Sequence, residues 1–456
     1  MGPGFGPRGS RLALELALAV SVAVAFADSS IVVLALPELY VELETTIPKI
    51  SWVITAYNLA VVVAAAVLLP FSRRVRPAWI ALAGLVIFLG ASVSCALADG
   101  LTSLVAGRVA QGVGAALLLG ASLPLLVALS GDRERAITVW VAAGTLGTAV
   151  GPALGGILTD AFDWRAIFVA QAPLAAAALV AALHPRARAL LPPRGEKSRI
   201  PLGAALGLIF TYAALVGALF LAVLLVVTVW DYGPLAGAGI VSALPLAALA
   251  ARPLAARLSG LWNLAGGSAL LAAGLVALAL LPASDPAYAI PALALAGVGL
   301  GLALPPLTRD SLPAQGDLTR SGVVSVGVRH LGLVAGLIAV APLLASELEK
   351  GGDRATVNAT AVILDAELPL QTKVPIVLDL YREFQRAPEG EIPDLAAPFD
   401  EHGAGDEPAV KEERDSLLEA VEAALTRAFR SSFALSALFA LLAGVTSIAF
   451  GRRVRA

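Results

Sequence analysis

The sequence is poor in charged residues, histidine and cysteine. Of its 456 residues 14% are charged and 58% hydrophobic, with three histidines and one cysteine, Cys95. Soluble domains carry about 25% charged residues, so this balance excludes an ordinary water-soluble globular core. A single cysteine inside an apolar run excludes a disulfide framework and a cysteine metal cluster.

The sequence also lacks the patterns of nucleotide-binding and catalytic sites. It has no phosphate-binding Gly-x-x-x-x-Gly-Lys-Ser/Thr loop, so ATP is not predicted as the direct energy source. Gly297, Gly299 and Gly301 lie in an apolar span and follow no soluble strand, so they do not indicate a dinucleotide site. With no metal-ligand spacing and no nucleophile–base cluster, we expect no enzyme, no cofactor, no metal and no nucleic-acid partner.

What the sequence does contain is a series of apolar runs about twenty residues long, the length needed to cross about 30 Å of hydrocarbon. The first run follows Arg8 and Arg11, as in a signal peptide, but it continues to Leu36 and is too long for one. We therefore predict a multi-pass, all-α membrane protein whose twelve helices cover about 12–36, 51–71, 77–97, 102–128, 137–158, 165–184, 202–230, 233–250, 261–282, 286–306, 322–346 and 431–450.

Basic residues mark every second loop. The opposite links carry acidic residues such as Glu38, Glu42 and Asp160. Positive loops stay in the cytoplasm, so we predict that both termini are cytoplasmic. The excess of Arg over Lys and the abundance of Ala indicate a bacterial source, and we therefore expect a bacterial inner-membrane protein. The basic loops hold Arg8, Arg11, Arg73, Arg74, Arg76, Arg133, Arg135, Arg186, Arg188, Arg194, Lys197, Arg199, Arg252, Arg257, Arg309, Arg320, Arg452, Arg453 and Arg455.

The two halves of the chain repeat one another. Gly112, Gly131, Asp132, Arg135, Gly147 and Gly151 recur 185 residues later. Internal duplication of this kind builds carriers with a site at the repeat interface. We predict two pseudo-symmetric six-helix bundles, residues 1–184 and 202–456, joined by a basic cytoplasmic linker at 185–201.

Residues 347–430 break this pattern. They are rich in Asp and Glu and lie outside by the topology, between helices 11 and 12. We expect an acidic, largely helical extracytoplasmic insertion. It is either a solvated cap, a lid over the outer mouth or a docking surface for an envelope partner.

The strongest motif lies on the fifth predicted helix and reads Gly147-Thr-Ala-Val-Gly151-Pro152-Ala-Leu-Gly155-Gly156. Glycines four residues apart share one helical face and let a neighbouring helix approach closely. Pro152 removes a backbone hydrogen bond and bends the helix. We predict that this face is a hinge and a seal against ion leak.

This run resembles the antiporter motif of the major facilitator superfamily. The resemblance is closest to its drug:proton antiporters, a branch that usually has fourteen helices, and it covers most of the first half and part of the second. Further similar segments are Asp28-Ser-Ser-Ile-Val-Val-Leu-Ala-Leu-Pro37, Ser51-Trp-Val-Ile-Thr-Ala-Tyr57-Asn-Leu59, Arg108-Val-Ala-Gln111-Gly112-Val-Gly114, Trp164-Arg-Ala-Ile-Phe168 with Gln171 and Pro173, and Arg329-His330-Leu-Gly332. The resemblance implies alternating access around a central cavity, with amphiphilic drugs as substrates.

The chain departs from the family in its gating loop. Arg73, Arg74 and Arg76 keep the basic residues of the cytoplasmic loop after helix 2, but Ser72 stands where the family has Asp. The counterpart after helix 8 has Ala256 at that place. We expect other contacts to replace the charge latch of that loop.

Asp28 and Arg108 are predicted to pair. Counting from the expected outer helix ends, they lie about 12 Å and 9 Å deep, and either charge alone in hydrocarbon would cost several kcal/mol. Burial and a neighbouring arginine shift the protonation of a carboxyl in opposite directions. A change in pairing would then bind or release a proton. The alternative is a static structural ion pair.

The remaining candidates are polar residues on the faces of other helices, Arg329 and His330 on helix 11 above all. Arg329 stands where the repeat has Gly144, so its charge is acquired; it either neutralises an anionic substrate or lipid headgroup, or is a paired or snorkelling arginine. His330 either titrates near neutral pH or is a hydrogen-bonded structural residue. The predicted substrate cavity comprises Tyr57, Asn58, Gln111, Gln171, Tyr212, Arg329 and His330.

These observations predict a proton-coupled exporter of small amphiphilic molecules, with membrane lipid, protons and substrate as its partners. Two alternatives stay open. One is export of a lipid or cell-envelope precursor, and the other is a non-transporting scaffold or sensor that uses the acidic outer segment.

Overall fold

The computed structural model describes residues 8–192, 201–312, 317–365 and 422–451, with residues 374, 375, 378, 379, 382 and 419 between them. All regular secondary structure in these residues is helical, and twelve helical segments are long and apolar enough to span a membrane. Lipid offers no partners to free backbone groups, so spanning segments must satisfy their own hydrogen bonds as helices do. The prediction of an all-α protein with twelve spans is confirmed.

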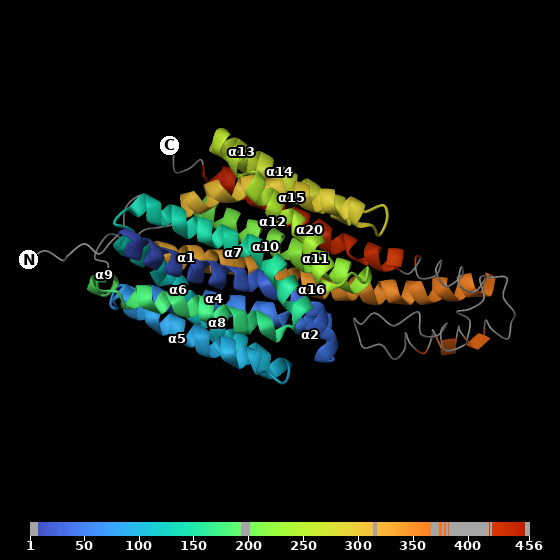
Figure 1. Cartoon of the computed structure of the whole chain (residues 1–456). Helices are drawn as coiled ribbons and strands as arrows, with labels where there is room; N and C mark the ends of the chain where they lie inside the picture. The colour runs from blue at the N-terminus through green and yellow to red at the C-terminus, as the bar shows by residue number, and fades with distance from the viewer. Residues whose placement is uncertain are drawn as a thin grey trace, which may run out of the picture.

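The helices run nearly parallel to one long axis (Figure 1). In chain order they are α1 (Arg8–Ile31), η1 (Val32–Ala35), α2 (Leu36–Glu42), α3 (Ile47–Ile50), α4 (Trp52–Phe71), α5 (Pro77–Ala96), α6 (Leu101–Ser130), α7 (Arg133–Ala161), α8 (Arg165–Leu183), α9 (Pro185–Ala189), α10 (Leu202–Val223), η2 (Leu224–Val229), α11 (Pro234–Val241), α12 (Ala243–Ala250), α13 (Arg252–Arg257), α14 (Gly260–Ala279), α15 (Pro286–Ser311), α16 (Leu318–Asp365) and α20 (Arg430–Gly451).

Two predicted helix ends were wrong for the same physical reason. The first span does not end at Leu36 but passes through the 3-10 turn η1 into α2, and the span from Pro234 continues to Arg257. Pro37 and Pro253 sit in the first turn of α2 and of α13. Proline is tolerated there because the first turn lacks intrahelical acceptors for its N–H groups. The chain therefore stays helical past each proline.

The eleventh span is also longer than expected. α16 begins at Leu318 and continues to Asp365, past the end predicted at 346. In Figure 1 it extends beyond the other helices, on the side away from the start of α1. The last span begins at Glu422. Most of the predicted insertion at 347–430 lies outside the described residues, as do 193–200 of the predicted linker.

The helices form two groups that follow chain order. In the first, α5 packs on α6 and α8, α1 on α7 and α8, and α4 on α6. In the second, α14 packs on α15 and α20, α10 on α16 and α20, and α12 on α15. Between the groups, α16 contacts α4 and α6, while α11 contacts α7. This is the arrangement of two six-helix bundles with a shared central interface.

Equivalent contacts show that the two bundles repeat one another. A Cβ added at Gly147 on α7 would meet the carbonyl oxygen of Ala23 on α1, and one added at Gly332 on α16 would meet that of Ile209 on α10. Both glycines therefore let helix backbones touch, which is how small residues drive helix packing in membranes. The first and fifth spans of each bundle pack in the same way.

The helix starts repeat as well. Asp132 accepts a hydrogen bond from the backbone N–H of Arg135, at 3.2 Å, at the start of α7. Asp317 accepts from the N–H of Arg320, at 3.0 Å, just before α16. An aspartate that accepts from an N–H three residues on is a standard helix N-cap. The sequence repeat thus corresponds to a structural one.

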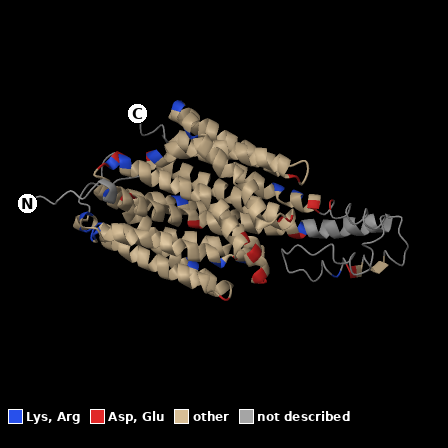
Figure 2. Cartoon of the chain, viewed as in Figure 1, with Lys and Arg blue, Asp and Glu red and all other residues tan. Residues whose placement is uncertain are grey.

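The surface around the bundle is apolar, with charge at both ends. Figure 2 shows Lys and Arg mostly at the end where α1 begins, and a group of Asp and Glu around α2 at the opposite end. We call these the basic end and the acidic end. Exposed apolar side chains cover the flanks, including Val63, Val67, Val86, Val169, Val180 and Ile338. Such a belt suits lipid and would be unfavourable in water.

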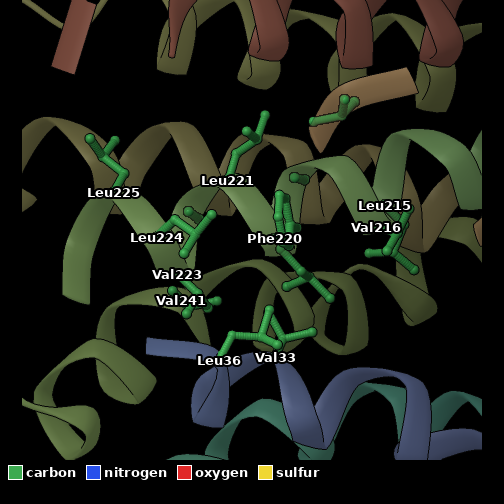
Figure 3. Packing of buried hydrophobic residues seen from close by; sticks show 14 of the residues in the cluster. Val33, Leu36, Leu215, Val216, Phe220, Leu221, Val223, Leu224, Leu225 and Val241 are labelled. Atoms are coloured by element: carbon green, nitrogen blue, oxygen red, sulfur yellow. The ribbon is translucent and has the colours of Figure 1, made fainter. Parts of the chain in front are cut away.

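A buried apolar cluster joins the two bundles toward the acidic end. Val33 and Leu36, from η1 and α2, face side chains of α10 and η2 such as Val223 and Leu224 (Figure 3). Val241 of α11 lies in the same cluster. These contacts close the interface on that side.

Candidate functional site

A buried ion pair occupies the centre of the first bundle. Asp28 on α1 and Arg108 on α6 are both fully buried, and Arg108 Nη1 donates to Asp28 Oδ2. The same nitrogen donates to Gln111 Oε1 at 2.6 Å, and Gln171 Nε2 on α8 donates to Asp28 Oδ1 at 2.7 Å. Gln111 Nε2 donates in turn to Gln171 Oε1 at 2.8 Å. Three helices thus join in a closed ring of side-chain hydrogen bonds.

The remaining groups of Arg108 are satisfied too. Its Nε donates to the carbonyl oxygen of Val53 at 2.9 Å, and its guanidinium carbon lies 4.3 Å from the centroid of the Tyr57 ring. Tyr57 donates its hydroxyl to the carbonyl oxygen of Ala25 at 2.7 Å. A buried ion pair is tolerable only when its other polar atoms also find partners. This network meets that condition.

The predicted pairing of Asp28 with Arg108 is therefore present, though the depth argument needed correction. Because the first span continues to Glu42, Asp28 lies near the middle of the span Arg11–Glu42 rather than eight residues from its end. A carboxyl at mid-span has less access to water than the sequence estimate implied. Its dependence on Arg108 is accordingly greater.

Two cavities lie between the bundles. The larger, of about 60 Å³, is lined by α7 of the first bundle and by α10, α12, α13, α15 and α16 of the second. The smaller, of about 20 Å³, is lined by α1, η1, α7, α10 and α16. They share Thr148, Tyr212, Leu215, Leu219 and Arg329.

Arg329 of α16 lies where the two cavities meet. It is 4% exposed, and its guanidinium carbon is 4.0 Å from the centroid of Phe26 and 4.7 Å from that of Tyr212. Its Nε has no hydrogen-bond partner, and the ion pairs formed by the described residues do not include it. Two aromatic rings thus hold a buried cation that no carboxylate of the described residues neutralises.

The predicted cavity residues occupy three different places. Tyr212, Arg329 and His330 line the cavities. Gln111, Gln171 and Tyr57 lie in the network around Arg108. Asn58 accepts a hydrogen bond from Ser29, at 2.9 Å, and Ser29 itself lines the smaller cavity.

His330 has the contacts of a packed, hydrogen-bonded side chain. Its Nδ1 lies 2.8 Å from the carbonyl oxygen of Val326, one helical turn earlier. Its ring stacks on Phe26, with 6.3 Å between centroids, and lies 6.2 Å from the ring of Tyr57. The side chain is 1% exposed. This geometry favours the structural interpretation of His330 over the titrating one.

The glycine motif of α7 packs against both bundles. A Cβ at Gly155 would meet the backbone of α1, as at Gly147, and one at Gly151 would meet the hydroxyl of Ser30 on α1. A Cβ at Gly156 would meet Ala238 and the carbonyl oxygen of Pro234 on α11. Pro152 lies between these contacts, inside α7. α7 is thus the helix on which α1 and α11 both rest near the acidic end.

The basic loop after α4 contacts the linker. Arg76 Nη1 donates to the carbonyl oxygen of Arg188 at 3.3 Å, and the Arg188 guanidinium lies 5.8 Å from the Trp79 ring. Ser72 is buried and donates to the carbonyl oxygen of Leu69 at 2.9 Å. The position that carries Asp in related motifs is here a helix end without charge. Arg73 and Arg74 lie beside it in the same loop.

Sequence reasoning missed several members of the site. Ser92 accepts from Gln111 Nε2 at 3.0 Å, and Cys95 lies 3.9 Å from Gln111 Oε1. Phe26 covers the guanidinium of Arg329. The three-residue spacing of Ser92 and Cys95 places them on one face of an apolar helix, which was a usable signal. Phe26 has no such signal in the sequence, because an aromatic residue in an apolar span cannot be distinguished from an ordinary core residue.

No group of three or more His, Cys, Asp or Glu side chains in the described part of the chain is arranged to hold a metal ion. The site is therefore built from an ion-pair network inside one bundle and a cation-lined cavity beside it. The two share helix α1.

Comparison with known sequences identifies the family. Residues 18–316, more than half of the chain, match the sequence profile of the Major Facilitator Superfamily. The multidrug resistance protein Stp of Mycobacterium tuberculosis (strain ATCC 25618 / H37Rv) is 36% identical over 160 residues, which are 34% of this chain and 29% of Stp. The methylenomycin A resistance protein of Bacillus subtilis (strain 168) is 33% identical over 182 residues, which are 39% and 38% of the two chains.

A third relative is the cephamycin export protein CmcT of Amycolatopsis lactamdurans, 32% identical over 189 residues, or 40% of this chain and 37% of CmcT. The chain thus aligns with less than two fifths of the length of each of these relatives. Among solved structures, a bacterial homologue of the human lysosomal transporter Spinster, inward-facing and occupied, gives a TM-score of 0.66 at 16% identity over 98% of both chains. That likeness shows the fold.

Proposed function

The chain belongs to the Major Facilitator Superfamily, and we propose that it is a secondary active transporter that exports small amphiphilic molecules in exchange for protons. Relatives named for multidrug resistance and cephamycin export support the direction and the substrate class. We also propose that the basic end faces the cytoplasm of a bacterial cell, because positively charged loops are retained on that side.

The observation that carries this proposal is the position of Asp28 relative to the cavities. Ser29 and Ser30, the next residues on α1, line the smaller cavity. Asp28 itself is bonded away from it, to Arg108 and Gln171. One turn of α1 therefore connects a buried acid to the substrate space. A bound substrate that moves α1 also changes the environment of the carboxyl.

The coupling step follows from the network. Protonation removes the charge of Asp28, so that Arg108 loses its ionic partner and the ring of hydrogen bonds between α1, α6 and α8 weakens. α1 is then released to shift on α7, whose glycine face allows close sliding contact with it. When the transporter opens toward the other side, Asp28 releases its proton and the ion pair with Arg108 forms again. A substrate and a proton would in this way use the two states alternately.

Reconstituted full-length protein provides the test. Proteoliposomes are given a pH gradient, and the uptake of labelled amphiphiles is followed together with lumenal pH. Wild type is compared with Asp28→Asn and with Glu15→Gln. Glu15 is the matched control, because it lies on the same helix and pairs with Arg135 at 2.9 Å near the basic end.

We expect Asp28→Asn to abolish gradient-driven transport and Glu15→Gln to retain it. Equal gradient-driven transport by wild type and Asp28→Asn would mean that the pair is only structural. A wild type that moves labelled lipids but none of the drugs would shift the substrate class to envelope precursors.

A further inference from the structure

The cavities between the bundles carry positive charge only. The described residues that line them include Arg329 and Arg252 but neither Asp nor Glu. Arg252 is exposed at the basic end, whereas Arg329 is buried deep between the bundles. A ligand that enters from the basic end therefore meets one arginine at the mouth and another inside.

The buried arginine has an unsatisfied charge. Arg108 has a carboxylate, an amide oxygen and a carbonyl oxygen as acceptors. Arg329 has the faces of Phe26 and Tyr212, a hydrogen bond to the Tyr212 hydroxyl and an Nε without an acceptor. A guanidinium presents a planar set of donors that matches carboxylate or phosphate oxygens. The missing partner of this side chain is an anion.

The rest of the cavity is mostly apolar, with Thr145, Thr148 and Thr308 among its lining residues. Leu215, Leu219, Leu244, Leu300 and Leu304 contribute to its wall, and the space that they enclose with the arginine is about 60 Å³. An apolar wall of this kind suits an aromatic or aliphatic group. A strongly hydrated inorganic anion would gain nothing from these walls.

We propose that the substrates of this transporter are amphiphilic organic anions, whose carboxylate, sulfonate or phosphate group binds Arg329 while their apolar body packs against the leucine-lined wall. This inference rests on the proposed export function and names its substrate class. Cationic amphiphiles are disfavoured, because they would place a second positive charge next to an unpaired one.

Anion binding at Arg329 also reaches the coupling helix. Phe26 covers the guanidinium and lies two residues before Asp28 on α1. An anion that engages Arg329 displaces or tightens this ring contact. The substrate thus acts on the same turn of α1 that holds the acid.

The test is a binding measurement without any gradient, on the full-length chain purified in detergent. Three probes share one fluorophore: dansylglycine is an anion, dansylglycinamide is neutral and dansylcadaverine is a cation. We expect dansylglycine to bind wild type at least about tenfold more tightly than the other two, as charge-assisted hydrogen bonds are stronger than neutral ones. Equal affinity for the three probes overturns the proposal.

Variants locate the preference. Arg329→Gln should lose the preference for the anionic probe: its affinity for dansylglycine should fall about tenfold or more, and its affinity for dansylglycinamide should not change. Arg329→Lys should keep part of the preference. Arg257→Gln is the matched control, because it removes an exposed charge from the same end without lining the cavity. An anion preference that survives in Arg329→Gln refutes the assignment.

The measurement is independent of proton coupling. Asp28→Asn should still bind dansylglycine, since Arg329 is intact. Selective binding of the anion without gradient-driven transport would contradict the proposed export function and leave the anion site standing. Gradient-driven transport of dansylcadaverine, with no preference for the anionic probe in binding, would support the proposed export function and contradict the anion site.

Discussion

Two buried arginines, one in each bundle, meet opposite surroundings. Arg108 is surrounded by acceptors, among them the carboxylate of Asp28. Arg329 is held by two rings and ends at a cavity. Either charge is costly in the membrane. In one case the protein supplies the counter-charge, and in the other it leaves that role to a ligand.

The difference is not inherited from the duplication. By the repeat offset Arg329 corresponds to Gly144, and the two positions face each other: a Cβ at Gly144 would lie 3.3 Å from Arg329 Nη1. The first bundle has a small residue at the position where the second has a cation. The guanidinium of Arg329 lies in the space left beside Gly144. Two positions that are related by the pseudo-symmetry therefore form one asymmetric site.

The largest expected difference is in stability. Arg108→Gln leaves the Asp28 carboxylate buried without its ion-pair partner, which should lower the free energy of unfolding by about 3–5 kcal/mol. Arg329→Gln removes a charge that has no counter-charge and should change it by less than about 1 kcal/mol, since lost cation–π contacts are offset by easier burial. Thermal or denaturant unfolding in detergent measures both.

A double variant checks the cause. Adding Asp28→Asn to Arg108→Gln removes the orphaned carboxylate and should recover part of the loss. A double variant no more stable than Arg108→Gln, or equal losses for the two arginine variants, would show that the two sites do not differ as described.

The second comparison uses the glycines that hold the first span of each bundle. Gly147→Ala and Gly332→Ala each place a methyl group against a backbone carbonyl, of Ala23 and Ile209 respectively. Both should destabilise the protein by about 1–3 kcal/mol. Only Gly332→Ala also presses on Tyr212, whose Cβ would lie 2.9 Å away. Binding of dansylglycine should therefore weaken in that variant alone, and an equal loss in Gly147→Ala would contradict this.

The sequence predicted the spans well because hydropathy is a local property. It misplaced the helix ends at Pro37 and Pro253, because a proline is compatible both with the end of a helix and with the first turn of a new one. Proline breaks a helix interior but is accepted in a first turn, and which applies depends on whether the chain continues in the same direction. That direction is set by packing against other helices, which sequence periodicity does not record.

The site was predictable in part for a similar reason. Asp28 and Arg108 were paired because two opposite charges at similar depth have few other ways to lower their energy. Gln111 and Gln171 were assigned to a substrate cavity, whereas they bond to the ion pair. Their direction depends on the rotation of α6 and α8 about their axes. In spans that are apolar on nearly all faces, periodicity does not define that rotation.

A smaller effect is expected at Gly144. A Cβ there would lie 2.9 Å from the Phe26 ring and 3.3 Å from Arg329 Nη1, so in Gly144→Ala the ring must shift. Loss of part of one cation–π contact, worth about 1 kcal/mol, should leave the guanidinium in place but less well oriented. Equilibrium binding of dansylglycine should weaken about three- to fivefold, with the affinity for dansylglycinamide unchanged. A fall in both affinities would indicate a general distortion of the cavity instead.

The smallest effect is expected at the mouth. Arg252 is exposed and acts on an approaching anion through solvent, so Arg252→Gln should slow the association of dansylglycine only about two- to threefold at low salt. Its dissociation rate should not change, because Arg329 holds the bound anion. At about 1 M salt, where screening reduces the Debye length to roughly 3 Å, the two association rates should coincide. Stopped-flow fluorescence separates the rates, and a difference that persists at high salt would place Arg252 in direct contact with the bound anion, so that both arginines would hold the ligand.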